Sequence, residues 1–139
     1  RKKMKKTMLT SFAILTIILT SSSQAFAHGE DKLGPHLGFI QMPGAFHTEV
    51  VKITNKKFKI YLLDLEWKNP TVKDSTVEAT LISKSVEELA VCDAKDVYYE
   101  CRLKNGSLKK GTLNIKAKRG DLIGSVAVYD LPLKLLKHH

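Results

Sequence analysis

The sequence lacks the short motifs that mark many enzyme active sites. It has no G-x-S-x-G, no H-E-x-x-H, no phosphate-binding loop and no glycine-rich dinucleotide turn, each of which holds reactive groups at a fixed spacing. Aromatic residues make up only 7% of the chain and are not interleaved with a basic cluster, as they are in nucleic-acid platforms. Internal repeats and low-complexity linkers are also missing. We therefore predict a protein that is not an enzyme and has no nucleic-acid partner.

Cysteine is scarce as well, since Cys92 and Cys101 are the only two. Eight residues lie between them, whereas thiolate metal ligands favour spacings of two to four. An isolated pair in an oxidising compartment usually forms a disulfide. We predict a structural bridge, with a pair of thiolate ligands as the alternative.

A long apolar run occurs only near the amino terminus, where it resembles a secretory signal. Lysines precede the apolar residues 8–20, and residues 25–27 end the segment in an A-x-A cleavage pattern. The run is short for a bilayer span, and no nearby cysteine indicates a lipid anchor. We predict a signal peptide at 1–27 and a bacterial protein that is periplasmic or secreted, with no membrane attachment after cleavage. An uncleaved anchor or a buried amphipathic helix is the alternative.

The predicted mature chain, residues 28–139, is long enough for one hydrophobic core. Five of the 23 basic residues lie in the signal, so 18 basic and 14 acidic residues remain and the formal charge falls from +9 to +4. A small excess spread along a chain is typical of a solvated surface. We predict a single β-sandwich domain at 28–139, which begins with an N-terminal arm at 28–44.

Alternation of apolar and polar residues predicts strands through the rest of the mature chain. Residues 86–91 fit either a strand or a helical turn, and the single tryptophan, Trp67, is expected in the core. The expected strands are residues 46–53, 57–67, 76–83, 97–103, 111–118 and 122–131, with hairpin turns at 55–56 and 105–106. Regularly spaced short strands predict an all-β fold, an antiparallel two-sheet sandwich of the immunoglobulin-like kind, after a cleaved N-terminal signal helix.

Three of the five histidines, His28, His36 and His47, lie close together in the sequence. After cleavage, the α-amine and imidazole of His28 would chelate one ion, and a second histidine would complete a nitrogen set that suits Cu(II). His47 and Glu49 share one face of a strand, and Met42 offers a thioether that suits Cu(I). We predict a metal site from these five residues, with copper as the ion and zinc as the alternative. Taken singly, each histidine is better explained by a structural role, and the metal prediction depends on the three together.

Residues 34–64 carry a resemblance to known proteins. They resemble small exported bacterial proteins with a G-P-[HN]-G-G … [FY]-H-x-E-[LV]-V … Y-L-x-D pattern, and are similar to the metal-binding segment of heavy-metal efflux adaptor proteins. The resemblance implies a β-sandwich that handles copper, zinc or related ions. The positions that it carries over are His36, Gly38, His47 and Glu49. Leu37 stands where the pattern has glycine.

These observations predict a periplasmic metal-binding protein, with copper as the first choice, that acts as a carrier, a buffer or an efflux accessory. Its partners would be the metal ion and an efflux or envelope protein. The alternative is a metal-free exported interaction module, which docks a protein partner by a sheet edge or by the arm at 28–44.

Overall fold

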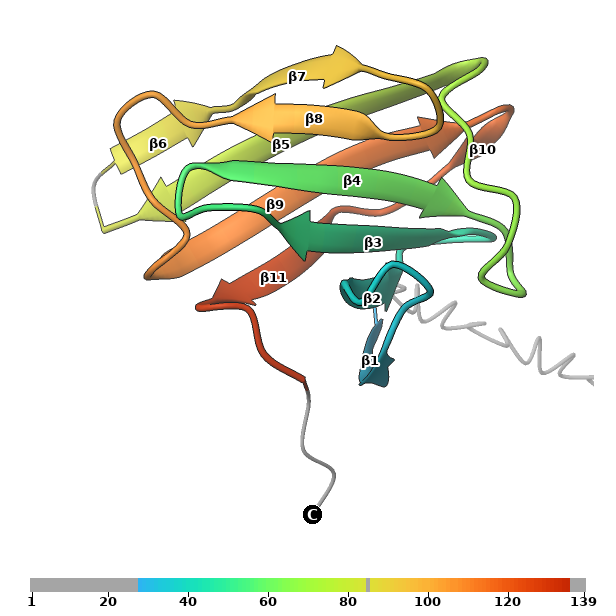
Figure 1. Ribbon diagram of the computed structural model, residues 1–139, viewed down its shortest axis with the longest axis horizontal. Helices are drawn as coiled ribbons and strands as arrows, with labels where there is room; N and C mark the ends of the chain where they lie inside the picture. The colour runs from blue at the N-terminus through green and yellow to red at the C-terminus, as the bar shows by residue number, and fades with distance from the viewer. Residues whose placement is uncertain (1–27, 85, 136–139) are drawn as a thin grey trace, which may run out of the picture.

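The structure, a computed structural model, describes residues 28–84 and 86–135. The predicted signal peptide at 1–27, with its helix, lies outside the described residues. All regular structure in the described part of the chain is β-strand (Figure 1). Within those residues, no helix is long and apolar enough to cross a membrane.

The strands form two antiparallel sheets that face each other across one core (Figure 1). The first sheet has the strand order β1-β2-β3-β4-β8-β7, and the second has the order β10-β9-β5-β6, with β11 also paired to β9. The prediction of an all-β, immunoglobulin-like two-sheet sandwich is confirmed. The strands are β1 (His28–Leu33), β2 (Phe39–Met42), β3 (His47–Lys52), β4 (Lys57–Leu63), β5 (Ser75–Ser83), β6 (Val86–Leu89), β7 (Val91–Ala94), β8 (Tyr99–Arg102), β9 (Gly111–Arg119), β10 (Leu122–Ile123) and β11 (Ala127–Leu131).

Alternation along the strands places one face of each sheet in the core. On β4, Phe58, Ile60 and Leu62 are fully buried between the sheets, where they meet Leu113 and Ile115 of β9. Burying a side chain of this size stabilises a fold by about 1.5–3 kcal/mol relative to leaving it exposed. The opposite face of β4 is therefore free to carry other side chains.

Residues 28–44, predicted as an arm, contain two strands of the first sheet. β1 pairs with β2 and β2 pairs with β3, both antiparallel. A loop at 34–38 joins β1 to β2, and Figure 1 shows this hairpin beside β3. The sequence did not predict these strands, because four glycines and two prolines interrupt the alternation between residues 28 and 44.

Two of the expected strands end or divide earlier than the sequence predicts. β4 stops at Leu63, because the side chain of Asp64 accepts the backbone N–H of Lys68 at 2.8 Å and turns the chain. The strand expected at 122–131 divides into β10 and β11, which both pair with β9. Residues 86–89 and residue 91 are strand rather than helix, and at Ala90, between them, the chain passes from the second sheet to the first.

The hairpin predicted at Asn105 and Gly106 is wrong. β8 and β9, which flank these residues, belong to different sheets and do not pair. The carboxylate of Glu88 accepts the backbone N–H of Lys104 at 2.6 Å and that of Gly106 at 2.7 Å. These bonds to β6 hold the connection open as a loop between the sheets, where a two-residue turn would have folded it back.

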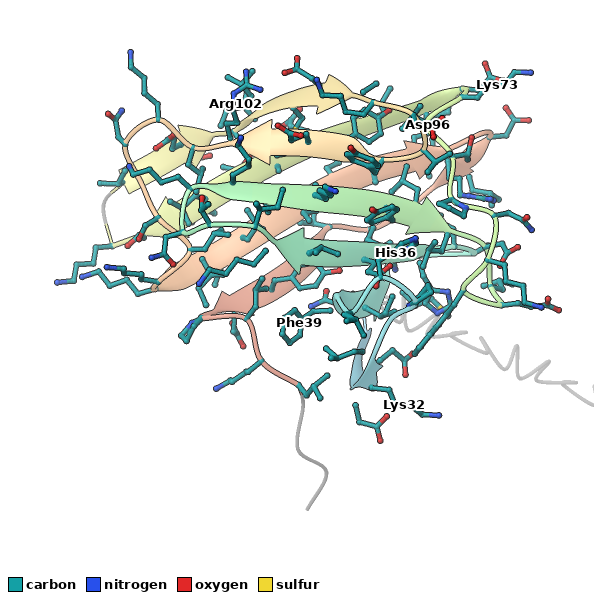
Figure 2. The ribbon with its side chains drawn as sticks, in the orientation of Figure 1. Lys32, His36, Phe39, Lys73, Asp96 and Arg102 are labelled. Carbon is teal, nitrogen blue, oxygen red and sulfur yellow. A yellow bond between two sulfur atoms is a disulfide. The ribbon has the colours of Figure 1, made fainter. Side chains whose placement is uncertain are left out.

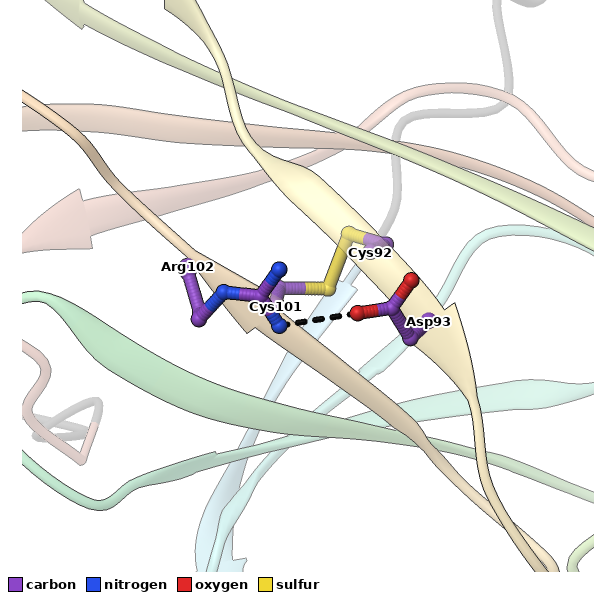
Figure 3. The surroundings of a disulfide bond; sticks show 4 residues. All are labelled: Cys92, Asp93, Cys101 and Arg102. Carbon is purple, nitrogen blue, oxygen red and sulfur yellow. Dashed lines mark hydrogen bonds and ion pairs between the residues drawn. A yellow bond between two sulfur atoms is a disulfide. The ribbon is translucent and has the colours of Figure 1, made fainter.

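Cys92 and Cys101 form the predicted disulfide between β7 and β8 (Figure 3). The two residues are direct partners in the ladder, and beside them Arg102 Nη1 donates to Asp93 Oδ2 at 2.8 Å. Closing a loop with a sequence separation of 9 stabilises the fold by about 2.7 kcal/mol in the chain-entropy account. A disulfide is compatible with an oxidising, exported location.

Candidate functional site

A second, smaller apolar cluster lies on the outer face of the first sheet. It contains the buried residues Ile40, Tyr61 and Leu63, with Trp67 and Tyr98 among the partly buried side chains packed against it. Tyr61 and Leu63 alternate with the core residues of β4, so the two clusters occupy opposite faces of one strand. The predicted site residues His36, His47 and Glu49 all contact this outer cluster or lie on its strands.

The carboxylate of Glu49 is fully buried and holds the 34–38 loop against β3. Its Oε2 accepts the backbone N–H of His36 at 2.9 Å and that of Gly38 at 3.0 Å. Its Oε1 lies 2.6 Å from Nδ1 of His36. With the carboxylate as acceptor, this imidazole nitrogen donates. A buried charge is tolerated only when it is fully bonded, and three donors meet that need here.

Two glycines of the pattern are explained by the same carboxylate. A Cβ added at Gly34 would lie 2.6 Å from Glu49 Cδ, and one at Gly38 would lie 2.7 Å from Glu49 Cγ. Any side chain at either position would push the loop off the carboxylate. Leu37, where the pattern has glycine, has a φ of 61°, in the left-handed region that favours glycine.

The imidazole ring of His36 is held by a stacking contact on its face and by the bond to Glu49 at its edge. Its ring stacks on Tyr61, with centroids 3.7 Å apart and an interplanar angle of 4°, and its side chain keeps 32% exposure (Figure 2). Tyr98 packs against Tyr61 at 5.3 Å, and Lys59 Nζ lies 4.5 Å from the Tyr98 ring. Burial, followed by the charges of Tyr98 and Glu49, raises the pKa of the Tyr61 hydroxyl.

Contacts with the turn that follows β4 fix the orientation of His47. Only 4% of it is exposed. Its Nδ1 lies 3.0 Å from the backbone oxygen of Asp64, and Trp67 meets its ring edge-on, with centroids 5.9 Å apart. A carbonyl can only accept, so Nδ1 carries a proton, and in the neutral ring the lone pair is on Nε2. This is the arrangement that metal-ligating histidines share.

The turn that presents this carbonyl is fixed by Asp64 itself. Asp64 Oδ1 accepts the backbone N–H of Lys68 at 2.8 Å, and Oδ2 accepts from Asn69 Nδ2 at 2.8 Å. The bond from Lys68 is the main cause that lowers the pKa of the Asp64 carboxyl. Trp67 within the turn has a φ of 63° and packs on the outer cluster, not in the main core that the sequence predicted.

The strand register aligns three of the predicted ligands. His28 on β1 is the ladder partner of Met42 on β2. Gln41 is the partner of Thr48 on β3, so the next residues along the two strands, Met42 and His47, are neighbours in the same row. Met42 is 38% exposed. We call His28, Met42 and His47 the cross-strand row; the side chain of His28 lies outside the described part.

His36 stands apart from this row. It belongs to the loop at one end of the β1–β2 hairpin, whereas His28 and Met42 pair at the other end. Both oxygens of Glu49 are engaged by the loop, so Glu49 positions His36 and the loop. Among the described residues, no group of three or more His, Cys, Asp or Glu side chains is arranged to hold a metal ion.

Sequence reasoning gave no role to Tyr61, Tyr98 or Lys59 and did not foresee what Asp64 does for His47. Alternation along β4 was the available signal for Tyr61, because it assigns that ring to the same face as Glu49 across the ladder.

No family model, no curated protein and no solved structure matches the chain.

Proposed function

We propose that the protein is an exported, periplasmic or secreted metal-binding protein, with copper as its ion and zinc as the alternative, which acts as a carrier, a buffer or an accessory to efflux. The observation that carries the proposal is the cross-strand row, in which the strand register brings His28, Met42 and His47 side by side. Efflux or envelope proteins are the partners that would receive or deliver the ion.

The donor types in the row suit copper in both oxidation states. The imidazole of His47 and, after cleavage behind Ala27, the α-amine and imidazole of His28 are nitrogen donors of the kind that Cu(II) prefers. The Met42 thioether is a soft donor of the kind that Cu(I) prefers. Because the Asp64 carbonyl holds the proton on Nδ1 of His47, the lone pair of the neutral ring is on Nε2, where an ion would bind.

His36 and Glu49 support the site from the neighbouring part of the face. Glu49 lies two residues from His47 on β3 and holds the loop that packs on Tyr61. In this proposal they keep the outer face rigid, and the cross-strand row alone supplies the ligands. Rigid placement of ligands before the ion arrives favours tight and selective binding.

The test is a competitive Cu(II) titration of the processed protein and three variants. His47→Asn keeps an N–H where Nδ1 donates to Asp64 and removes Nε2, so the fold is retained while the ligand is lost. One residue added ahead of His28 moves the α-amine. The control, His138→Ala with His139→Ala, removes two histidines of the tail.

We expect His47→Asn and the extended chain each to bind Cu(II) about tenfold more weakly, or about 1.4 kcal/mol, and the tail variant to bind as the parent does. Equal affinities for all four proteins, or a loss confined to the tail variant, would refute the metal proposal. The alternative function, a metal-free module that docks a partner by a sheet edge, would then be favoured, because β1 is an edge strand of the six-stranded sheet.

A further inference from the structure

Lysines gather at one end of the sandwich, although their spacing in the sequence suggested an even distribution. Three connections meet there: the β3–β4 turn, the β5–β6 connection and the β8–β9 loop (Figure 1, at the left). Residues 52–57 and 104–110 contain no Asp or Glu. The members of this lysine-rich end are Lys52, Lys56, Lys57, Lys84, Lys104, Lys109 and Lys110.

Hydrogen bonds join the turn and the loop into one continuous surface. Leu103 N–H donates to the Lys56 carbonyl at 2.8 Å, and Leu108 N–H donates to the Asn55 carbonyl at 2.7 Å. Lys56 Nζ donates to the carbonyl oxygen of Asn105 at 3.2 Å. These bonds fix the backbone of the turn against the backbone of the loop.

Few carboxylates offset this charge, although Glu87 is exposed on β6 beside Val86. Glu88 is engaged by the backbone N–H groups of Lys104, Asn105 and Gly106, and Glu100 lies 3.7 Å from Lys57 Nζ. Across the residues that the structure describes, Lys57 is the only lysine of this end within 4.0 Å of a carboxylate. The opposite end is mixed, because its turns carry acidic residues such as Asp64, Asp74 and Asp96 beside Lys68, Lys73 and Lys95 (Figure 2).

Two exposed apolar side chains belong to the same end of the sandwich. Ile53, in the β3–β4 turn, is 45% exposed, and Val86, at the start of β6, is 52% exposed. Beside Val86, a hollow of about 310 Å³ is lined in part by Ser83, Ser107 and Lys110. Hydroxyl groups next to an ammonium group suit a phosphate.

We propose that the lysine-rich end docks on an anionic phospholipid surface. Lysines near such a surface are attracted to it, at about 1 kcal/mol each. Exposed apolar residues among basic ones insert at the boundary between headgroups and acyl chains, which a soluble polyanion would not need. Docking leaves the candidate site open, since β1 and β2, which carry His28 and Met42, lie away from this end (Figure 1). The proposal does not depend on metal binding.

The test is co-sedimentation with vesicles of phosphatidylcholine, with and without phosphatidylglycerol. The variant Lys104→Gln/Lys109→Gln/Lys110→Gln removes three exposed charges, and the matched control removes three at the opposite end, Lys68→Gln/Lys73→Gln/Lys95→Gln. All three proteins share the same amino terminus, so differences between them report the two ends alone. Circular dichroism checks that each variant is folded.

We expect the parent to bind only the vesicles that contain phosphatidylglycerol, and the first variant to bind them at least about tenfold more weakly, whereas the control binds as the parent does. Equal losses in both variants, or equal binding to both kinds of vesicle, would overturn the proposal. Ile53→Ser gives a second test, because it keeps every charge. Weaker vesicle binding by this variant supports lipid docking. Unchanged vesicle binding, with displacement from the vesicles by polyphosphate, would mean that a soluble polyanion is the partner.

Discussion

Replacing Glu49 by glutamine tests whether a buried carboxylate fastens the 34–38 loop. The glutamine keeps the shape of the side chain but removes the charge. The carboxylate accepts three hydrogen bonds, at 2.9, 3.0 and 2.6 Å. Each bond to a charged group is worth about 1 kcal/mol more than a neutral one, and the lower cost of burying a neutral amide offsets part of the sum.

We therefore expect Glu49→Gln to lower the free energy of unfolding by about 2 kcal/mol. At about 4 °C per kcal/mol for a domain of this size, the melting temperature should fall by roughly 8 °C. The amide oxygen can still accept the two backbone N–H groups, and its NH₂ group then faces Nδ1 of His36. The imidazole must change its tautomer so that Nδ1 can accept a hydrogen bond from this NH₂ group, and Nε2 then becomes the protonated nitrogen.

The assays are denaturant unfolding and nitrogen-15 NMR of the imidazole rings. Glu78→Gln, on an exposed position of β5, is the control and should leave the stability unchanged. His36→Asn, which keeps a donor for the carboxylate, should cost less than His36→Ala. A loss of stability below about 0.5 kcal/mol for Glu49→Gln, within the range of ordinary surface substitutions, together with an unchanged His36 tautomer, would refute the role given to the carboxylate.

Two further predictions concern the backbone and the core. Leu37→Gly should raise the free energy of unfolding by about 0.5–1 kcal/mol, because Leu37 is exposed and has a φ of 61°, and denaturant titration checks this against the parent. Burial raises the pKa of the Tyr129 hydroxyl, which lies 2.7 Å from Thr48 Oγ1. Because the pKa is raised in the folded state, the protonated hydroxyl stabilises the fold at neutral pH. This contribution is lost as the pH rises above about 10. Tyr129→Phe should lower the free energy of unfolding at neutral pH by about 1 kcal/mol. It should also make the loss of stability at alkaline pH smaller. An unchanged pH profile would contradict this.

The sandwich was predictable because its central strands each bury one face. In β4, the alternation of Phe58, Ile60 and Leu62 with other residues marks the core directly. The same period put His47 and Glu49 on one face of β3, which the structure confirms. A pattern that repeats every two residues reflects which face of a strand is buried, so it can be recognised from the sequence alone.

The candidate site was predictable only in its residues, not in its arrangement. The bond between His36 and Glu49 spans thirteen positions and depends on how the loop folds over the sheet. The hairpin expected at Asn105 and Gly106 failed for a related reason, since Glu88, far along the chain, binds that segment. The left-handed backbone at Trp67 likewise comes from the turn that Asp64 organises. Contacts of this kind have no local signature in a sequence.

Nitrogen-15 NMR of the imidazoles during titration with Cu(I) shows directly whether the cross-strand row binds copper. We expect Nε2 of His47 to shift with one equivalent of ion, while Nδ1 stays protonated and bonded to the Asp64 carbonyl. Unshifted His47 resonances at one equivalent, with copper bound elsewhere or not at all, would contradict this expectation.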